Sequence, residues 1–224
     1  MIKLHLLSTP GDRDIRWVLD ACRPHLAGKS EPVVAFLPQA WLNVNHWLDY
    51  TVRSFEKLAR VESIDTEQMD LPAMEDLIRR AHVVYISGGN TFLLNHRLHV
   101  SGLMAYLRRK VQAGLPVVGF SAGMIVCGPN ILTANDLNAV ETPHFSGLNA
   151  SPFNFFAHYI PELSMHDDWL SDYHTFHDNS VIMLSDGAYV KVDGKKATLV
   201  RGDGWILRKG MEKVRLEEGK LITA

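Results

Sequence analysis

The chain has 224 residues, of which 46% are hydrophobic and 21% charged, so it is long enough for one α/β domain with a sizeable core. Its 23 Lys and Arg residues nearly balance its 25 Asp and Glu residues, which excludes the strongly basic surface typical of nucleic-acid-binding proteins. Cys22 and Cys127 belong to no metal-binding or redox motif and are expected to be buried, reduced thiols.

The N-terminal apolar stretch, residues 2–7, stops at Ser8-Thr9-Pro10-Gly11, short of a signal-peptide core or a membrane span. We therefore expect a single-domain cytoplasmic protein, residues 1–224, that binds neither nucleic acid nor a membrane.

Short β-rich segments alternate with amphipathic segments over the first 120 residues. This alternation is typical of βα units that build a mostly parallel sheet. In the segment 103–113, for example, Leu103, Leu107 and Val111 recur on one helical face. The expected strands are 2–7, 33–37, 82–87 and 116–120, and the expected helices are 15–22, 44–60, 73–80 and 103–113.

After about residue 180 the pattern changes to short strands separated by turns. These turns lie at Asp186-Gly187, Asp193-Gly194 and Gly202-Asp203-Gly204. The spacing predicts an antiparallel meander at the C-terminal end of the chain.

A serine lies on a turn of small residues, Gly119-Phe120-Ser121-Ala122-Gly123, directly after the strand expected at 116–120. A buried strand that ends in this pattern is typical of a nucleophile elbow, in which a sharp strand-to-helix turn exposes the serine hydroxyl. The backbone N–H of Ala122, at the start of the helix, is then a candidate donor to an oxyanion. An ordinary structural turn remains the alternative interpretation of the same five residues.

A second turn of small residues, Ser87-Gly88-Gly89-Asn90-Thr91, follows the strand expected at 82–87. Open α/β sheets bind ligands at such strand ends, and the exposed N–H groups of Gly88 and Gly89 are candidate donors. The alternative is a helix entry that Asn90 caps without any ligand.

A serine nucleophile also needs a general base and a group that orients it. Among eleven histidines, His158 follows an aromatic tract, where partial desolvation favours the neutral form that accepts a proton, and His144 is its nearest rival. The candidate orienting carboxylates are Asp136 and Asp186, although Asp186 also suits a hairpin turn.

Several of these motifs, in this order, resemble those of the peptidase E family of serine peptidases, which includes aspartyl dipeptidases and, more distantly, cyanophycinases. The glycine pair at 88–89, the elbow at 119–123, Thr133-Ala134-Asn135-Asp136 and His158 all match the family pattern. Leu184-Ser185-Asp186-Gly187 is similar to the family's Leu-Pro-Glu-Gly, whereas Phe156-Ala157 replaces the family's Asn-Pro before the histidine. The resemblance spans nearly the whole chain.

The resemblance implies a three-layer α/β sandwich related to class I glutamine amidotransferases, and peptide hydrolysis through an acyl-enzyme. Ser121 would attack, His158 would move the proton, and Asp186 or Asp136 would orient the imidazole, with Asp186 favoured. The turn Gly88, Gly89 and Asn90, together with Ala122, would bind the substrate and the oxyanion. The implied enzyme needs no metal or cofactor, acts on small peptides, and is a monomer or homodimer.

The aspartyl dipeptidases that the chain resembles carry an arginine after the histidine, which matches the charge of the substrate's aspartate. No arginine occurs here between residues 159 and 200, and the segment 165–174 is acidic and rich in histidine. We therefore expect a neutral or basic N-terminal residue in the preferred substrate.

Three alternatives remain at this stage. The same elbow would suit an esterase, or the fold would serve as a non-catalytic small-molecule binding protein. A metal site is the third, built from His166, Asp167, Asp168, His174, His177 and Asp178.

Overall fold

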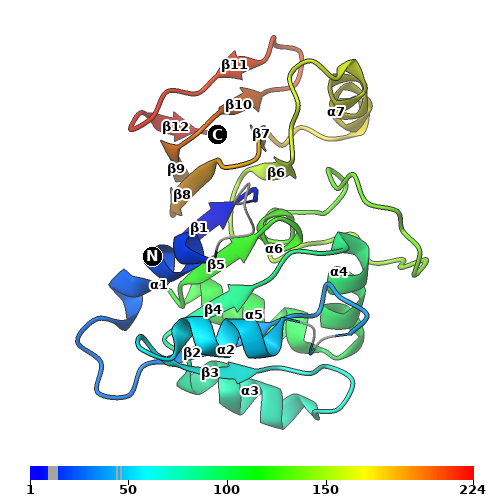
Figure 1. The fold of residues 1–224 in the computed structure, drawn as a ribbon. Helices are drawn as coiled ribbons and strands as arrows, with labels where there is room; N and C mark the ends of the chain where they lie inside the picture. The colour runs from blue at the N-terminus through cyan, green and yellow to red at the C-terminus, as the bar shows by residue number, and fades with distance from the viewer. Residues whose placement is uncertain (10–14, 44, 46) are drawn as a thin grey trace.

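The computed structural model describes residues 1–9, 15–43, 45 and 47–224. Their strands form two sheets, a large one and a small one (Figure 1). The large sheet has the order β12 (Leu221–Thr223), β9 (Lys196–Arg201), β8 (Tyr189–Asp193), β1 (Lys3–Leu7), β5 (Val117–Phe120), β4 (Val83–Ile86), β2 (Val33–Leu37) and β3 (Arg60–Ser63). The small sheet has the order β11 (Val214–Arg215), β10 (Gly204–Leu207), β7 (Val181–Leu184) and β6 (Asn154–Ala157).

In the large sheet, five neighbouring strands are parallel, in the order β1, β5, β4, β2 and β3. The strands β8, β9 and β12 extend the sheet beyond β1 in antiparallel pairs. The expected class, α/β with a mostly parallel sheet and antiparallel C-terminal strands, is confirmed. The structure adds that the C-terminal strands divide between two sheets, because β7 and β10 pair with each other in the small sheet while β8 and β9 join the large one.

Helices cover both faces of the large sheet, in keeping with a sandwich of three layers (Figure 1). On one face α1 (Arg16–Leu26) and α2 (Leu48–Phe55) pack on alternate residues of β2, Val34 and Phe36. The opposite alternates, Ala35 and Leu37, pack with the helices α3 (Leu71–Arg80), α4 (Thr91–Val100), α5 (Leu103–Gln112) and α6 (Ala122–Ile125). This period-two division explains why β2 is apolar at every position.

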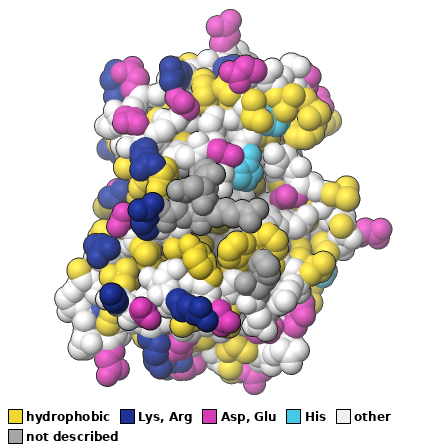
Figure 2. Space-filling model, viewed as in Figure 1, with side chains coloured by type: hydrophobic (Ala, Val, Ile, Leu, Met, Phe, Trp, Pro, Cys, Tyr) yellow, Lys and Arg dark blue, Asp and Glu magenta, His cyan; other side chains and the backbone are white. Residues whose placement is uncertain are grey.

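The small sheet packs against α7 (Ser164–Phe176) through Phe156, Leu170 and Tyr173. It also shares the larger hydrophobic cluster through Phe155 and Ile182. Charges of both signs are interspersed over the face shown in Figure 2, as expected for a nearly neutral chain. Within the described residues no helix is long and apolar enough to cross a membrane.

The expected strands are each found within one residue of their observed ends. The helix expected at 44–60 is shorter, Leu48–Phe55, and residues 56–58 form a turn. Arg60, the last residue of the expected helix, begins β3, a short and only partly buried strand whose apolar signal is weak. Residues 44 and 46 of that expected helix lie outside the described residues. Both cysteines are free and buried, as expected.

Candidate active site

Ser121 lies between β5 and α6 with φ 51° and ψ −110°, a backbone conformation that residues with a side chain rarely adopt. Its N–H donates to the carbonyl of Leu7 at 2.9 Å, which ties the turn to β1. The residues two positions before and two positions after Ser121 must be glycines. A Cβ on Gly119 would collide with the backbone of Gly123, and one on Gly123 would collide with that of Ile86. The segment thus has the strand-turn-helix geometry of a nucleophile elbow.

His158 follows β6, and its imidazole lies between Ser121 and Asp186. The Ser121 hydroxyl is 2.8 Å from Nε2, and Nδ1 is 2.6 Å from the Asp186 Oδ1. In the tautomer that carries its proton on Nδ1, Nδ1–H donates to the carboxylate and Nε2 accepts from the hydroxyl. Three separate segments therefore converge on one Ser-His-Asp arrangement, and the His158 side chain is 37% exposed to solvent.

The structure brings Asp186, and not Asp136, to His158. Asp136 instead accepts a hydrogen bond at 2.8 Å from the backbone N–H of Thr91, at the start of α4. Asn90 caps the same helix by accepting from the N–H of Leu93 at 2.9 Å. The Asn90 side-chain oxygen therefore caps α4, as the helix-entry interpretation predicts.

The glycine pair at the end of β4 lies against the elbow. A Cβ on Gly88 would be 3.0 Å from the Cβ of Ser121, so the two turns are in contact. Gly89 has φ +132° and packs on the backbone of Ala40, which leaves no room for a side chain. The strands β4 and β5 are parallel neighbours, so both turns lie at the carboxyl ends of the strands. The N–H groups of the glycine pair and of Ala122 therefore lie in the region around the serine.

Ser8, which the sequence analysis did not single out, supports His158. Its buried hydroxyl accepts a hydrogen bond from the backbone N–H of His158 at 2.9 Å and donates to the carbonyl of Leu184 at 3.2 Å. His158 itself has φ +59°, so this bond holds a residue in a rarely adopted conformation. In the sequence, Ser8 is only a polar residue at the end of a buried strand. This position does not reveal that its hydroxyl contacts His158.

Tyr159 anchors α7 beside the histidine. Its hydroxyl donates to Asp167 at 2.6 Å, and Lys213 donates to both Tyr159 at 2.6 Å and Asp167 at 2.5 Å. Burial raises the pKa of the Tyr159 phenol, and the hydrogen bonds to Asp167 and Tyr159 raise the pKa of Lys213. This network therefore holds a neutral phenol between the carboxylate and the ammonium group.

Two carboxylates of the metal-site alternative are paired with lysines instead. Asp167 accepts from Lys213 in this network, and Asp178 is 2.7 Å from the Lys209 ammonium group. Among the residues that the structure describes, no three His, Cys, Asp or Glu side chains gather as a metal site would require.

A cavity of about 460 Å³ lies beside β6, between α7 and the segment that carries Asp136. Phe156, two residues before His158, forms part of its wall. Asp136 and Asp172 give it two carboxylates, and none of its described lining residues is Lys or Arg. We call this space the acidic cavity; its remaining described lining residues are Leu132, Thr133, Ala134, Asn135, Trp169, Leu170, Tyr173, Phe176 and His177.

Residues 8–200 match the sequence model of peptidase family S51. A probable alpha-aspartyl dipeptidase of Drosophila melanogaster is 37% identical over 148 residues, which cover 62% of this chain and 60% of that protein. A Peptidase E of Shewanella denitrificans is 37% identical over 126 residues, which cover 55% of this chain and 52% of that protein. The chain thus matches little more than half the length of these two relatives. A Peptidase E of Nostoc sp. is 31% identical over 182 residues, 77% of this chain and 74% of that protein.

Two solved structures share the fold. A putative peptidase E protein from Listeria monocytogenes superposes with a TM-score of 0.71 at 23% identity, over 90% of this chain and 98% of that one. A peptidase from an acI-B1 Actinobacterium superposes with a TM-score of 0.76 at 19% identity, over 100% of this chain and 98% of that one. At these identities the likeness concerns the fold alone.

Proposed function

The chain belongs to peptidase family S51, and we propose from this premise that it is a serine dipeptidase, which cleaves short peptides through an acyl-enzyme on Ser121. The observation that carries the proposal is the hydrogen-bonded chain from the Ser121 hydroxyl through His158 to Asp186. Nucleophile, base and orienting group stand in the order that acyl transfer by a hydroxyl requires.

In the first half of the reaction, the Ser121 oxygen attacks the peptide carbonyl while His158 Nε2 takes the hydroxyl proton. The backbone N–H groups of Gly89 and Ala122 stabilise the negative oxygen of the tetrahedral intermediate. The intermediate collapses with cleavage of the C–N bond, and His158 gives the proton to the leaving amine. Asp186 stabilises the imidazolium formed between these steps.

In the second half, water takes the place of the leaving amine. His158 removes a proton from the water as it attacks the acyl-enzyme, and then returns a proton to the Ser121 oxygen. The products are two amino acids, or an amino acid and a shortened peptide, and the enzyme regains its starting protonation state. No metal or organic cofactor takes part in this scheme.

The preferred first residue of the substrate is neutral or basic. Two carboxylates, Asp136 and Asp172, face the acidic cavity, and the chain has no arginine between residues 159 and 200 to offset them. A substrate with an N-terminal aspartate would meet like charge there, whereas a lysine side chain would meet opposite charge. This preference separates the chain from relatives whose names specify aspartyl dipeptides.

We also treat residues 1–224 as one domain. The support is a single hydrophobic cluster that includes Leu4 and Ile86 of the large sheet together with Phe155 and Ile182 of the small sheet. A unit that shares one core is expected to unfold in one cooperative transition.

The test is hydrolysis of unblocked dipeptides varied at the first residue, measured as release of free amino acids in the presence of a metal chelator. The native protein is compared with Ser121→Ala and with Ser101→Ala, a serine at the far end of α4. We expect the native protein and Ser101→Ala to cleave neutral or basic substrates and Ser121→Ala to be inactive. Equal activity of Ser121→Ala would refute the mechanism, and Asp-X peptides as the best substrates would refute the stated preference.

A further inference from the structure

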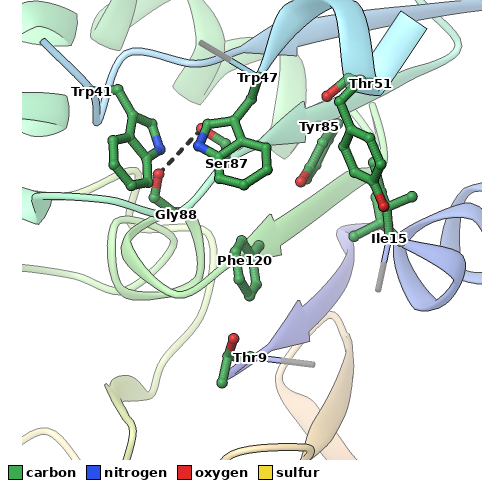
Figure 3. Close-up of a pocket in the computed structure, with 11 residues that line it drawn as sticks. Thr9, Ile15, Trp41, Trp47, Thr51, Tyr85, Ser87, Gly88 and Phe120 are labelled. Carbon is green, nitrogen blue, oxygen red and sulfur yellow. Dashed lines mark hydrogen bonds between the residues drawn. The ribbon is translucent and has the colours of Figure 1, made fainter. Parts of the chain in front are cut away.

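We propose that a second cavity, beside Ser121 and lined by aromatic rings, binds a large apolar side chain of a substrate residue next to the scissile bond. The inference rests on the proposed peptidase function and names the substrate class. We call this space the aromatic cavity; its described lining residues are Thr9, Ile15, Val18, Trp41, Trp47, Tyr50, Thr51, Tyr85, Ser87, Gly88 and Phe120 (Figure 3).

The aromatic cavity has a volume of about 400 Å³, within the roughly 300 to 1,000 Å³ usual for small-molecule sites. Trp41, Trp47 and Tyr50 form a row along it, with 6.0 Å between the ring centroids of each neighbouring pair. Tyr85 forms an inner wall, and its ring is stacked at 5.1 Å on the buried Phe36. Packed rings of this kind give a preformed space for an apolar group.

The cavity reaches the proposed nucleophile through Gly88 and Phe120. A Cβ on Gly88 would lie 3.0 Å both from the ring of Phe120 and from the Cβ of Ser121. Both lining residues are therefore within contact distance of the elbow itself. A peptide whose carbonyl carbon is at the Ser121 hydroxyl has a neighbouring side chain at the cavity mouth.

The chemistry of the walls selects an apolar occupant. None of the described lining residues is charged, and the hydroxyl of Ser87 already lies 3.4 Å from the carbonyl of Leu37 and 3.3 Å from that of Gly88. A charged side chain placed here would lose its hydration without gaining a charged partner among the described lining residues, whereas an aromatic or long aliphatic one would leave water for an apolar surface.

No described residue lines both the acidic cavity and the aromatic cavity. The two cavities are therefore separate spaces of different chemistry, one for each residue of a dipeptide. The aromatic cavity therefore favours a large apolar side chain in the substrate. This preference is additional to the one for a neutral or basic first residue.

The kinetic test compares two peptide series, Ala-X and X-Ala, with X as Ala, Leu, Phe, Asp and Lys. At one of the two positions we expect kcat/KM for Phe to exceed that for Ala by about tenfold or more, the order of selectivity that apolar pockets reach. Tyr50→Ala, which removes an exposed part of the wall, should lower the Phe/Ala ratio several-fold. Val18→Phe, which fills the cavity, should reduce the ratio further.

The matched control is Tyr106→Ala, a tyrosine on α5 outside both cavities, which should leave the Phe/Ala ratio unchanged. Because Val18 is buried and its variant can fail to fold, the exposed Tyr50 variant decides the outcome alone if Val18→Phe is unfolded by circular dichroism. No Phe preference at either position, or a preference that Tyr50→Ala leaves intact, overturns the proposal.

Calorimetric titration of Ser121→Ala with the same peptides separates this proposal from the proposed function, since it requires no turnover. Tighter binding of Phe peptides than of Ala-Ala, weakened by adding Tyr50→Ala, supports the aromatic cavity even if the native protein hydrolyses nothing. Hydrolysis by the native protein together with equal binding of Phe and Ala peptides retains the peptidase and overturns the aromatic cavity.

Discussion

The hydroxyl of Ser8 accepts a hydrogen bond from the backbone N–H of His158, although the two residues are 150 positions apart in the chain. The bond joins the end of β1, in the centre of the large sheet, to the end of β6, at the edge of the small one. Since β1 also holds the elbow through the bond from Ser121 N–H to Leu7, one strand sets the relative position of nucleophile and base.

Ser8→Ala should therefore reduce kcat by about tenfold or more with little change in KM, because a small displacement of the base misaligns proton transfer. It should also cost about 1 to 3 kcal/mol of stability, since the His158 N–H loses its acceptor and the Leu184 carbonyl loses its donor. Steady-state kinetics and urea unfolding measure the two effects. Ser151→Ala, at another buried serine whose hydroxyl accepts from Phe153 N–H, should lose stability without the selective fall in kcat.

The two candidate carboxylates should separate cleanly by mutation. Asp186→Asn should lower kcat on the order of a thousandfold or more, because an amide no longer stabilises the imidazolium or fixes its tautomer. Asp136→Asn should keep kcat within about tenfold, since an amide oxygen still accepts from Thr91 N–H, and should raise KM for basic peptides. A larger kcat loss for Asp136→Asn than for Asp186→Asn would reverse the assignment.

The elbow should reject any side chain at Gly123. In Gly123→Ala the new methyl group would overlap the backbone of Ile86, so we expect a loss of about 3 kcal/mol or more together with lost activity. Thermal unfolding and the dipeptide assay check both. Gly28→Ala is the comparison, because nothing lies within 4 Å of its Cβ position and only its positive φ opposes the change, at about 1 to 2 kcal/mol without loss of activity.

Stability should fall between pH 6.5 and pH 4 because of His5. Burial, then the charges of His25, Lys191 and Lys3, lower its pKa from the ordinary 6.5 to about 4, and Asp193 opposes them. Below pH 6.5 the unfolded chain binds a proton that the native imidazole does not, so this stability is complete above that pH and is lost as pH falls towards 4.

The loss from His5 should reach about 3 kcal/mol, at up to about 1.4 kcal/mol per pH unit. Native His5 is bonded to the Tyr189 hydroxyl and lies 2.8 Å from His25, whose pKa burial also lowers, so His25 adds to the same trend. His5→Gln should flatten the pH profile of urea unfolding at constant ionic strength. An equal slope in the variant and the native protein would contradict this account.

Local sequence patterns predicted most of the strands of the parallel sheet. The strands at 2–7, 33–37, 82–87 and 116–120 are confirmed because each is a short, mostly apolar run, and such runs need no distant partner to be recognised. β3 was missed because it is short and only partly buried. α7 was not expected because its buried residues, His166, Leu170, Tyr173 and His174, include two histidines that obscure the apolar stripe.

The sequence by itself determined the elbow at Ser121, the glycine pair at 88–89 and the family, since each depends on residue types at close spacing. Only the tertiary structure decided that Asp186 rather than Asp136 meets His158, that Ser8 holds the histidine, and that rings from 41 to 120 enclose a cavity beside the serine. These contacts join segments that are distant along the chain. Their geometry is set by the order of strands in two sheets, which no local pattern contains.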